Sequence, residues 1–270
     1  MEKSKIEWCD YSYNPVTGCL HNCPYCYAEK MSRRFCGDIR HNKTVADFSE
    51  NNGIYEIENE IVSRNGRSVT YPFGFAPTLH RNRLTKNCKP AKVKKPSTFF
   101  VCSTADLFGE WVPAEWVDNV LEVCEDNPRH RYLFLTKNPS GYISLFPMWK
   151  ALHNKELYKN FWLGTSISSK DDISKVFLMQ DIHMRYKINT FLSIEPIFEN
   201  IATPEFRNTG IQWVIVGAET GQRRNKVVPE KQWIEDIVSV CKRNGIPVFL
   251  KNNLADVWKD ELIQQYPWSV

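Results

Sequence analysis

The sequence lacks long apolar runs and a strong charge of either sign. No segment of its 270 residues approaches the length of a membrane span. The opening residues, MEKSKIEWCDYSYNPV, contain no apolar stretch that could serve as a secretory signal, so we expect a cytoplasmic protein without a membrane anchor. The net charge of +4 is too small to argue for nucleic-acid binding by itself.

The composition also lacks any bias towards disorder or fibrous structure. Apolar residues make up 42% of the chain and charged residues 24%, which are ordinary values for a globular protein. A chain of this length forms one large domain or two small ones. In a reducing cytosol, its nine cysteines are expected to be metal ligands, catalytic thiols or buried apolar residues rather than disulfide partners.

Short apolar runs recur along the chain, and each ends in small or polar residues. Their continuous hydrophobicity, without alternation, favours strands covered on both faces, as in a parallel sheet. Helical patterns between the runs start at Pro113 and at Pro229, and the second stops at Gly245, a favoured cap. The seven predicted strands lie within residues 12–18, 98–106, 131–137, 161–168, 189–196, 211–220 and 246–252.

This order of strands and helices predicts an α/β fold with right-handed crossovers. No GxGxxG loop appears anywhere in the sequence, so a Rossmann sheet fits poorly. We expect instead a partial or full TIM-like (β/α) barrel of about six or seven parallel strands.

Residues 35–97 interrupt this order. They contain an Asn65-Gly66 pair, which is typical of a two-residue hairpin turn. Within them, residues 81–95 carry seven basic side chains and no acidic one. We interpret 35–97 as an insertion, a hairpin plus a basic segment, in a single domain that spans residues 1–270.

The stretch TGCLHNCPYCYAEK places Cys19, Cys23 and Cys26 within eight residues. A structural zinc site needs a second Cys or His pair, and none has a suitable spacing, although Cys9, Cys36 and His21 are available. Buried structural cysteines are improbable in so polar a loop. Iron–sulfur clusters normally take four Cys ligands, so three ligands would leave one iron open to a small molecule.

The CxxxCxxC spacing, with Tyr25 before the last Cys, resembles the signature of the radical S-adenosylmethionine (SAM) superfamily. The resemblance implies that the three Cys hold a 4Fe–4S cluster whose unique iron chelates the amino and carboxylate groups of SAM. It further implies that the reduced cluster cleaves SAM to methionine and a 5′-deoxyadenosyl radical, which abstracts hydrogen from a substrate. A flavodoxin- or ferredoxin-like electron donor and a full or partial TIM-like barrel are implied as well.

A narrower resemblance covers nearly the whole chain. The blocks NPVTGC, CPYCYA, LHRNRL, STADLF, FWLGTSIS, FLSIEP and VGAETG are similar, in order, to those of a phage- and prophage-associated radical SAM family. That family usually has Trp where Tyr13 stands, a GGESG-like loop where GAETG stands, and Gln-Trp where Asn252-Asn253 stand. The last departure puts in doubt any role for that strand end.

In a parallel barrel, the chemistry takes place at the carboxyl ends of the strands, and these ends are polar here. By resemblance, the end of the second strand binds the methionyl amino group, and the end of the fourth binds the ribose and carboxylate. Tyr25 should lie near the adenine. The residues expected to bind the cofactor are therefore Tyr25, Ser103, Thr104, Asp106, Ser166, Ser168, Glu195 and Glu219.

Structural roles are open for several of these residues. Asp106 and Ser166 have the chemistry of helix caps. Glu195 has Lys137 and Lys251 as potential ion-pair partners, and Glu219 is equally suited to a substrate. His80 is a candidate for the site and, with equal weight, a packed or surface histidine.

Only one cluster is expected, because the other cysteines are scattered without paired spacing. Cys124 and Cys241 lie on apolar helix faces and are assigned to the core. Any of the rest could donate a hydrogen atom, but nothing in the sequence selects one of Cys9, Cys36, Cys88 and Cys102.

The basic residues supply the only indication of substrate. A phosphate-binding rim would suit a nucleotide or nucleic acid, whereas a solvated charged loop needs no partner. The alternatives are a peptide-modifying radical SAM enzyme and a non-catalytic protein that binds nucleic acid and holds a metal or cluster. The oligomeric state is open. The candidate rim comprises Arg81, Arg83, Lys86, Lys89, Lys92, Lys94, Lys95, Arg223, Arg224 and Lys226.

Overall fold

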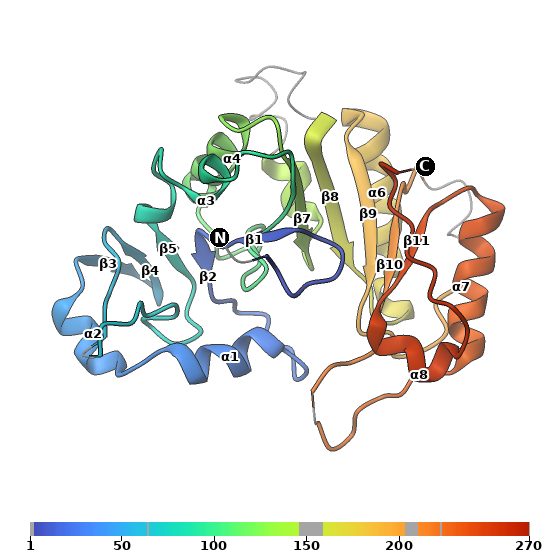
Figure 1. Ribbon diagram of the computed structural model, residues 1–270, viewed down its shortest axis with the longest axis horizontal. Helices are drawn as coiled ribbons and strands as arrows, with labels where there is room; N and C mark the ends of the chain where they lie inside the picture. Colours follow the sequence, from blue (N-terminus) through green and yellow to red (C-terminus); the bar gives the residue numbers. More distant parts are fainter. Residues whose placement is uncertain (1–2, 64, 146–158, 203–209, 222, 270) are drawn as a thin grey trace. The chain divides into compact units, whose positions relative to one another are not determined.

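The computed structural model describes residues 3–63, 65–145, 159–202, 210–221 and 223–269 (Figure 1). Seven strands form one sheet in the order β1-β6-β7-β8-β9-β10-β11. Strand β1 pairs in parallel with β6, and β8 to β11 pair in parallel in sequence order. The predicted α/β fold, a partial TIM-like barrel of parallel strands, is confirmed. The strands are Tyr11–Tyr13, Thr98–Val101, Arg131–Thr136, Phe161–Ser166, Asn189–Ile194, Val214–Val216 and Val248–Leu250.

The chain divides into two compact units, each described by itself. Unit 1 comprises residues 1–4 and 9–132, and unit 2 comprises residues 5–8 and 133–270. No helix within the described ranges combines the length and the hydropathy needed to cross a membrane.

In unit 2, the apolar runs form strands that are buried along their whole length in β8 and from the second residue onward in β9, as expected for a sheet covered on both faces. Helix α6 (Ile173–Tyr186) packs against β8 and β9. Helix α7 (Lys231–Arg243) starts two residues after the predicted Pro229, and Gly245 follows its end with φ +66°, as a capping glycine should. The short elements of unit 2 are η3 (Lys170–Asp172), η5 (Asn252–Leu254) and α8 (Ala255–Trp258).

In unit 1, a second sheet has the order β2-β5-β4-β3 (Figure 1, blue to teal). Its strands are Val16–Thr17, Thr78–His80, Ile54–Ile57 and Phe48–Asn51. Helices α1 (Tyr27–Phe35) and α2 (Ile39–Val45) precede this sheet's hairpin in sequence. Helix α4 (Ala114–Glu125) begins one residue after the predicted Pro113, which caps it, and the remaining elements are η1 (Arg81–Arg83) and α3 (Lys89–Lys92).

The predicted first strand, residues 12–18, is wrong as one element. Pro15 divides it into β1, in the seven-stranded sheet, and β2, in the four-stranded sheet. Proline has no N–H for a ladder, while its carbonyl accepts the amide of His80 at 2.8 Å. The chain therefore changes sheets immediately before the cysteine loop.

Residues 35–97 contain more structure than one hairpin. The chain does reverse near Asn65-Gly66, where Val62 and Ser68 form an antiparallel bridge. A longer hairpin joins β3 to β4 through Asn52 and Gly53, whose φ angles of +50° and +78° are those of a type I′ turn.

Candidate functional site

The cysteine loop starts at a tightly packed glycine in unit 1. Gly18 has φ +84°, and its amide donates to the carbonyl of Thr104 at 3.0 Å. A Cβ at this position would lie 2.2 Å from the carbonyl oxygen of Ala76, so only glycine fits. The amide of Cys19 then donates to the carbonyl of Phe75 at 3.1 Å. These bonds fix the direction in which the loop leaves β2.

The loop ends at the start of helix α1. The amide of Cys26 donates to the carbonyl of Cys23 at 3.0 Å, and Cys26 is the N-cap of the helix. Its Sγ accepts the amide of Glu29 at 3.4 Å. The third thiol therefore lies at a helix N-terminus, where backbone N–H groups and the helix dipole favour negative charge.

The thiols lie close enough to influence one another's ionisation. The pKa of Cys19 is raised to about 12, mainly by burial. The charges of Asp106, Cys23 and Cys26 act in the same direction, and a backbone hydrogen bond from His21 opposes them. Burial likewise raises the pKa of Cys26, against hydrogen bonds from the amides of Glu29 and Ala28. Thiolates gathered in this way require a cation to offset their charge, which a metal centre supplies.

The donor set fits a thiolate-bound cluster, because three Cys lie in one short loop and backbone N–H groups donate to the thiols of Cys19 and Cys26. The side chains are not arranged around one point. Within the ranges that the structure describes, no three His, Cys, Asp or Glu side chains surround a common metal position.

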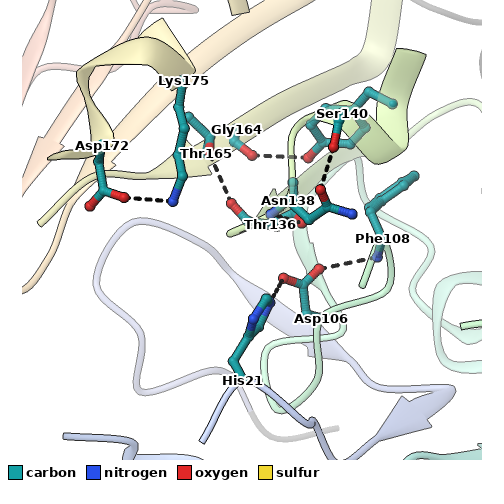
Figure 2. Close-up of polar contacts among 11 residues, drawn as sticks. His21, Asp106, Phe108, Thr136, Asn138, Ser140, Gly164, Thr165, Asp172 and Lys175 are labelled. Carbon is teal, nitrogen blue, oxygen red and sulfur yellow. Dashed lines mark hydrogen bonds and ion pairs between the residues drawn. The ribbon is translucent and has the colours of Figure 1, made fainter. Parts of the chain in front are cut away.

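A buried carboxylate holds the middle of the loop (Figure 2). Oδ2 of Asp106 lies 2.7 Å from Nε2 of His21, and its Oδ1 accepts the amide of Phe108 at 3.1 Å. The imidazole packs edge-on against Trp111, with ring centroids 4.8 Å apart. Asp106 is 5% exposed. Sequence reasoning assigned Asp106 to the cofactor and did not connect it with His21.

The other predicted residues of unit 1 lie around the same loop. The Ser103 hydroxyl donates to Oδ1 of Asn14 at 3.1 Å, and its carbonyl accepts the hydroxyl of Tyr27 at 2.5 Å. Thr104 is buried and Tyr25 is half-buried. Ser103, Thr104 and Asp106 therefore share one loop that contacts the cysteine segment at Gly18, Tyr27 and His21.

Tyr71 is a buried side chain that sequence reasoning did not select. Burial raises the pKa of its hydroxyl, whose polar neighbours are Thr104, Arg83 and the Cys26 thiol. Tyr71 lies within the predicted insertion, and the residues around it contain no motif that indicates a place in the site.

His80 is a packed histidine. Its Nε2 lies 2.9 Å from Oγ1 of Thr17, and burial lowers its pKa well below the usual value.

Several side chains of the basic segment, residues 81–95, are bound within the protein. Arg83 donates to the carbonyl of Asn14 at 2.6 Å, and Lys89 donates to the carbonyl of Ser12 at 2.8 Å. Arg81 forms ion pairs with Glu56, Glu58 and Glu115, so the exposed cations of the segment are Lys86, Lys92, Lys94 and Lys95.

In unit 2, Ser166 is the last residue of β8, and Ser168 lies two residues beyond it. Ser166 is buried opposite Ser193 of β9. The amide of Ser168 donates to Oδ2 of Asp172 at 2.8 Å, and Asp172 pairs with Lys175 at 2.7 Å (Figure 2). The buried Ser168 hydroxyl has no hydrogen-bond partner among the described residues. Buried polar groups are normally satisfied, so this hydroxyl is suited to a ligand.

Glu195 forms an ion pair with Lys251, one of the two partners expected from the sequence. The pair packs over Gly217, where a Cβ would lie 2.9 Å from Cδ of Lys251 and 3.1 Å from Cδ of Glu195. Glycine at the end of β10 therefore lets a carboxylate and an ammonium from β9 and β11 meet.

Glu219 is bound within its own loop. Arg223 donates to both of its oxygens, through Nε at 2.7 Å and Nη2 at 2.8 Å, and the amide of Val227 adds a 3.4 Å contact. These bonds, the Arg223 bond first, lower the pKa of the buried Glu219 carboxyl. Both carboxylate oxygens of Glu219 already accept hydrogen bonds from its own loop, so its role is to hold that loop together.

We expect Glu219→Gln to weaken the pH dependence of stability in acid. The Glu219 pKa is lower in the folded than in the unfolded chain, so its contribution is present above the unfolded value and is lost as the pH falls through the folded value. At pH 7 the variant should melt about 2–4 °C lower, and the difference should shrink between about pH 4.5 and pH 3. Thermal melts across this range measure it. The control is Glu235→Gln, which breaks an exposed pair with Lys231 and should change neither the melting temperature at pH 7 nor its pH dependence. If the melting temperature of Glu219→Gln stayed below that of the wild type by the same amount down to about pH 3, the linkage would be contradicted.

Two solved structures have a fold similar to that of this chain. The chain is similar to spore photoproduct lyase complexed with dinucleoside spore photoproduct, with a TM-score of 0.55 and 11% identity, over 92% of this chain and 78% of that one. A variant of that enzyme with bound AdoMet and dinucleoside spore photoproduct gives a TM-score of 0.54 and 10% identity, over 93% and 78%. At this level of identity, the likeness shows a shared fold.

The family assignment comes from the sequence itself. The model of the family described as protein of unknown function (DUF5131) matches residues 3–261, and the chain belongs to this family. No curated protein matches the chain. The narrower resemblance to a phage-associated family remains a prediction.

Proposed function

We propose that this protein is a radical SAM enzyme in which Cys19, Cys23 and Cys26 hold a 4Fe–4S cluster. The observation that carries the proposal is the cysteine loop itself, closed by Gly18 at one end and by the Cys26 cap of α1 at the other. Its three thiols share one electrostatic environment. The fold likeness to an enzyme solved with bound AdoMet supports the same assignment.

The chain's own residues would bind and orient the cofactor. The chemistry that the cluster and SAM supply when bound is one-electron cleavage of the sulfonium, followed by hydrogen-atom abstraction. With Cys19, Cys23 and Cys26 as its ligands, the cluster would have one iron available for the amino and carboxylate groups of SAM. We propose that the Ser103–Asp106 loop of unit 1, which contacts the cysteine segment, supplies the polar groups that contact SAM. Glu195 and Glu219 are already paired, so we assign them to shaping the strand ends.

We propose a nucleotide or nucleic acid as the substrate class. A structurally similar enzyme is solved with dinucleoside spore photoproduct, and this chain has exposed cations in both units. These are Lys86, Lys92, Lys94 and Lys95 in unit 1, and Arg224 and Lys226 in unit 2. A peptide substrate is the rival. Incubating the reduced enzyme and SAM with an oligonucleotide or a peptide pool, and measuring which raises 5′-deoxyadenosine formation, separates them.

Anaerobic reconstitution tests the proposed activity. About four irons and four sulfides per chain are expected, together with dithionite-dependent formation of 5′-deoxyadenosine from SAM. Stoichiometric zinc with no cleavage of SAM would overturn the proposal.

A zinc site is the second candidate, and one observation favours it. Histidines that ligate zinc commonly donate their other ring N–H to a carboxylate, and Asp106 contacts His21 in this way. His21 would then complete a Cys3His set in a non-catalytic protein that binds nucleic acid. Metal analysis of the reconstituted chain decides between zinc and iron.

We expect Asp106→Asn to loosen the cluster. Asparagine keeps the size of the side chain but removes the charge that orients His21 within the loop. Losses of this kind typically cost roughly 10- to 100-fold in metal affinity, so a chelator should extract iron roughly 10 times faster from the variant. Asp47→Asn, on the exposed surface of unit 1, is the matched control. Equal extraction rates for wild type and Asp106→Asn would show that the His21 contact does not hold the loop.

A further inference from the structure

Unit 1 exposes an unusual concentration of large apolar side chains. In the described part of the chain, ten such side chains are exposed, and six of them lie between residues 20 and 45. Soluble proteins rarely leave apolar residues clustered at the surface without a binding role. The six are Leu20, Tyr27, Met31, Phe35, Ile39 and Val45.

Helix α1 gathers three of these six on one side. Tyr27, Met31 and Phe35 are spaced four residues apart and are 45%, 38% and 56% exposed. Lys30 and Arg34 stand at the intervening positions of the same side, which we call the α1 face. The helix is buried through Ala28 and Ser32, which lie along one edge of this face. The helix therefore anchors itself with small residues and presents its large ones to solvent.

The α1 face is basic as well as apolar. Neither Lys30 nor Arg34 has an ion-pair partner among the described residues, and both are exposed. The one acidic residue of the helix, Glu29, is neutralised by Arg33 at 2.7 Å. Such a surface complements an acidic partner, which its charges would steer during encounter.

We propose that the α1 face is the docking surface for an acidic electron-transfer protein that reduces the cluster; this rests on the function proposed above. The face begins at Tyr27, directly after Cys26, the last of the three proposed ligands. The nine-residue helix is about 13 Å long, which suits the small interfaces of transient redox complexes. In each encounter the donor loses one electron and the cluster gains it, with no transfer of atoms.

The composition of the face favours a protein over a nucleic acid. Tyr, Phe, Met and Arg are enriched in protein interfaces, and they supply four of its five side chains. Interfaces with nucleic acids are more polar and more strongly charged. An oligonucleotide on this face is therefore the competing outcome of the test.

The test compares two reductants in the Lys30→Glu/Arg34→Glu variant. We expect SAM cleavage driven by a reduced acidic flavodoxin, below saturation and at low salt, to fall about 10-fold or more. Cleavage driven by dithionite, and the iron content, should equal those of the wild type. The flavodoxin-driven rate of the wild type should fall with added salt, and that of the variant should not. Lys5→Glu/Lys242→Glu reverses two exposed lysines of unit 2 and should retain both rates.

Three results would overturn the docking surface. The first is a variant that keeps the wild-type flavodoxin rate. The second is a variant that loses both rates equally, which would place the charges in the fold or the chemistry. The third is a variant that loses binding of a fluorescent single-stranded oligonucleotide while keeping the flavodoxin rate, which would assign the face to nucleic acid. Failure of the proposed function is distinct, because the wild type itself would then show no cleavage with dithionite.

Discussion

Replacing any one of Cys19, Cys23 and Cys26 with alanine is expected to eliminate both the cluster and the cleavage of SAM. A cluster held by only three protein ligands has none to spare, because its fourth position is reserved for SAM. Iron after anaerobic reconstitution should fall from about four per chain to well below one, and 5′-deoxyadenosine should fall to background. Iron analysis and chromatography of the reaction mixture measure the two effects.

The remaining cysteines supply controls for this result. Cys36 lies outside the motif and is half-buried, with its Sγ 3.5 Å from the carbonyl of Gly37. Cys36→Ala should retain iron and activity. Cys241 is fully buried on α7, so Cys241→Ala should lower stability but still bind iron. Iron loss in Cys36→Ala equal to that in Cys23→Ala would show that the ligands are wrongly assigned.

Gly18→Ala is expected to be the most damaging change outside the cysteines. Its φ of +84° strains any other residue, and the added Cβ would meet the carbonyl oxygen of Ala76 at 2.2 Å. Because the clashing atom belongs to the backbone, relief requires β2 or the cysteine loop to move. We expect a loss of about 3 kcal/mol or more in unfolding free energy, together with loss of most of the iron.

Gly53→Ala is the control that adds backbone strain from a positive φ without a steric clash. Gly53 has φ +78°, but a Cβ at this position would meet no atom of the described residues within 4 Å. This variant should lose only about 1 kcal/mol and keep its iron. Chemical denaturation and iron analysis of the two variants measure the difference. If Gly18→Ala and Gly53→Ala proved equally stable and equally loaded, the close packing of the loop against Ala76 would be refuted.

The strands of the parallel sheet were predictable because burial on both faces leaves a continuous apolar run. The run at 161–168, for example, contains β8, all six residues of which are buried. The predicted ends were too long where the chain leaves the sheet. The run at 211–220 yields only Val214–Val216, since its last residues form the loop that Glu219 and Arg223 close.

The second sheet was only partly predictable. The Asn52-Gly53 pair carries the strongest short-range hairpin signal, and it does join β3 to β4. The prediction placed a hairpin only at Asn65-Gly66 and so did not include the hairpin between β3 and β4. The pairing of β2 with β5 could not be inferred, because it joins Val16 to Leu79 across a long separation in sequence.

Contacts within the candidate site escaped prediction for the same reason. The cysteine spacing is local and could be recognised in the sequence. The His21–Asp106 contact joins residues 85 positions apart, and neither residue type indicates the other. Arg81 and Arg83 were likewise expected at a phosphate-binding rim. Instead, Arg81 forms an ion pair with Glu56, and Arg83 donates a hydrogen bond to the carbonyl of Asn14.

The central claim is that three thiolates hold a cluster with one iron left for SAM, and electron paramagnetic resonance tests it most directly. The reconstituted, dithionite-reduced protein should give the signal of a reduced 4Fe–4S cluster, and adding SAM should shift its g values, because SAM binds the open iron. A signal that SAM leaves unchanged, or a protein that holds zinc and gives no signal, would contradict it.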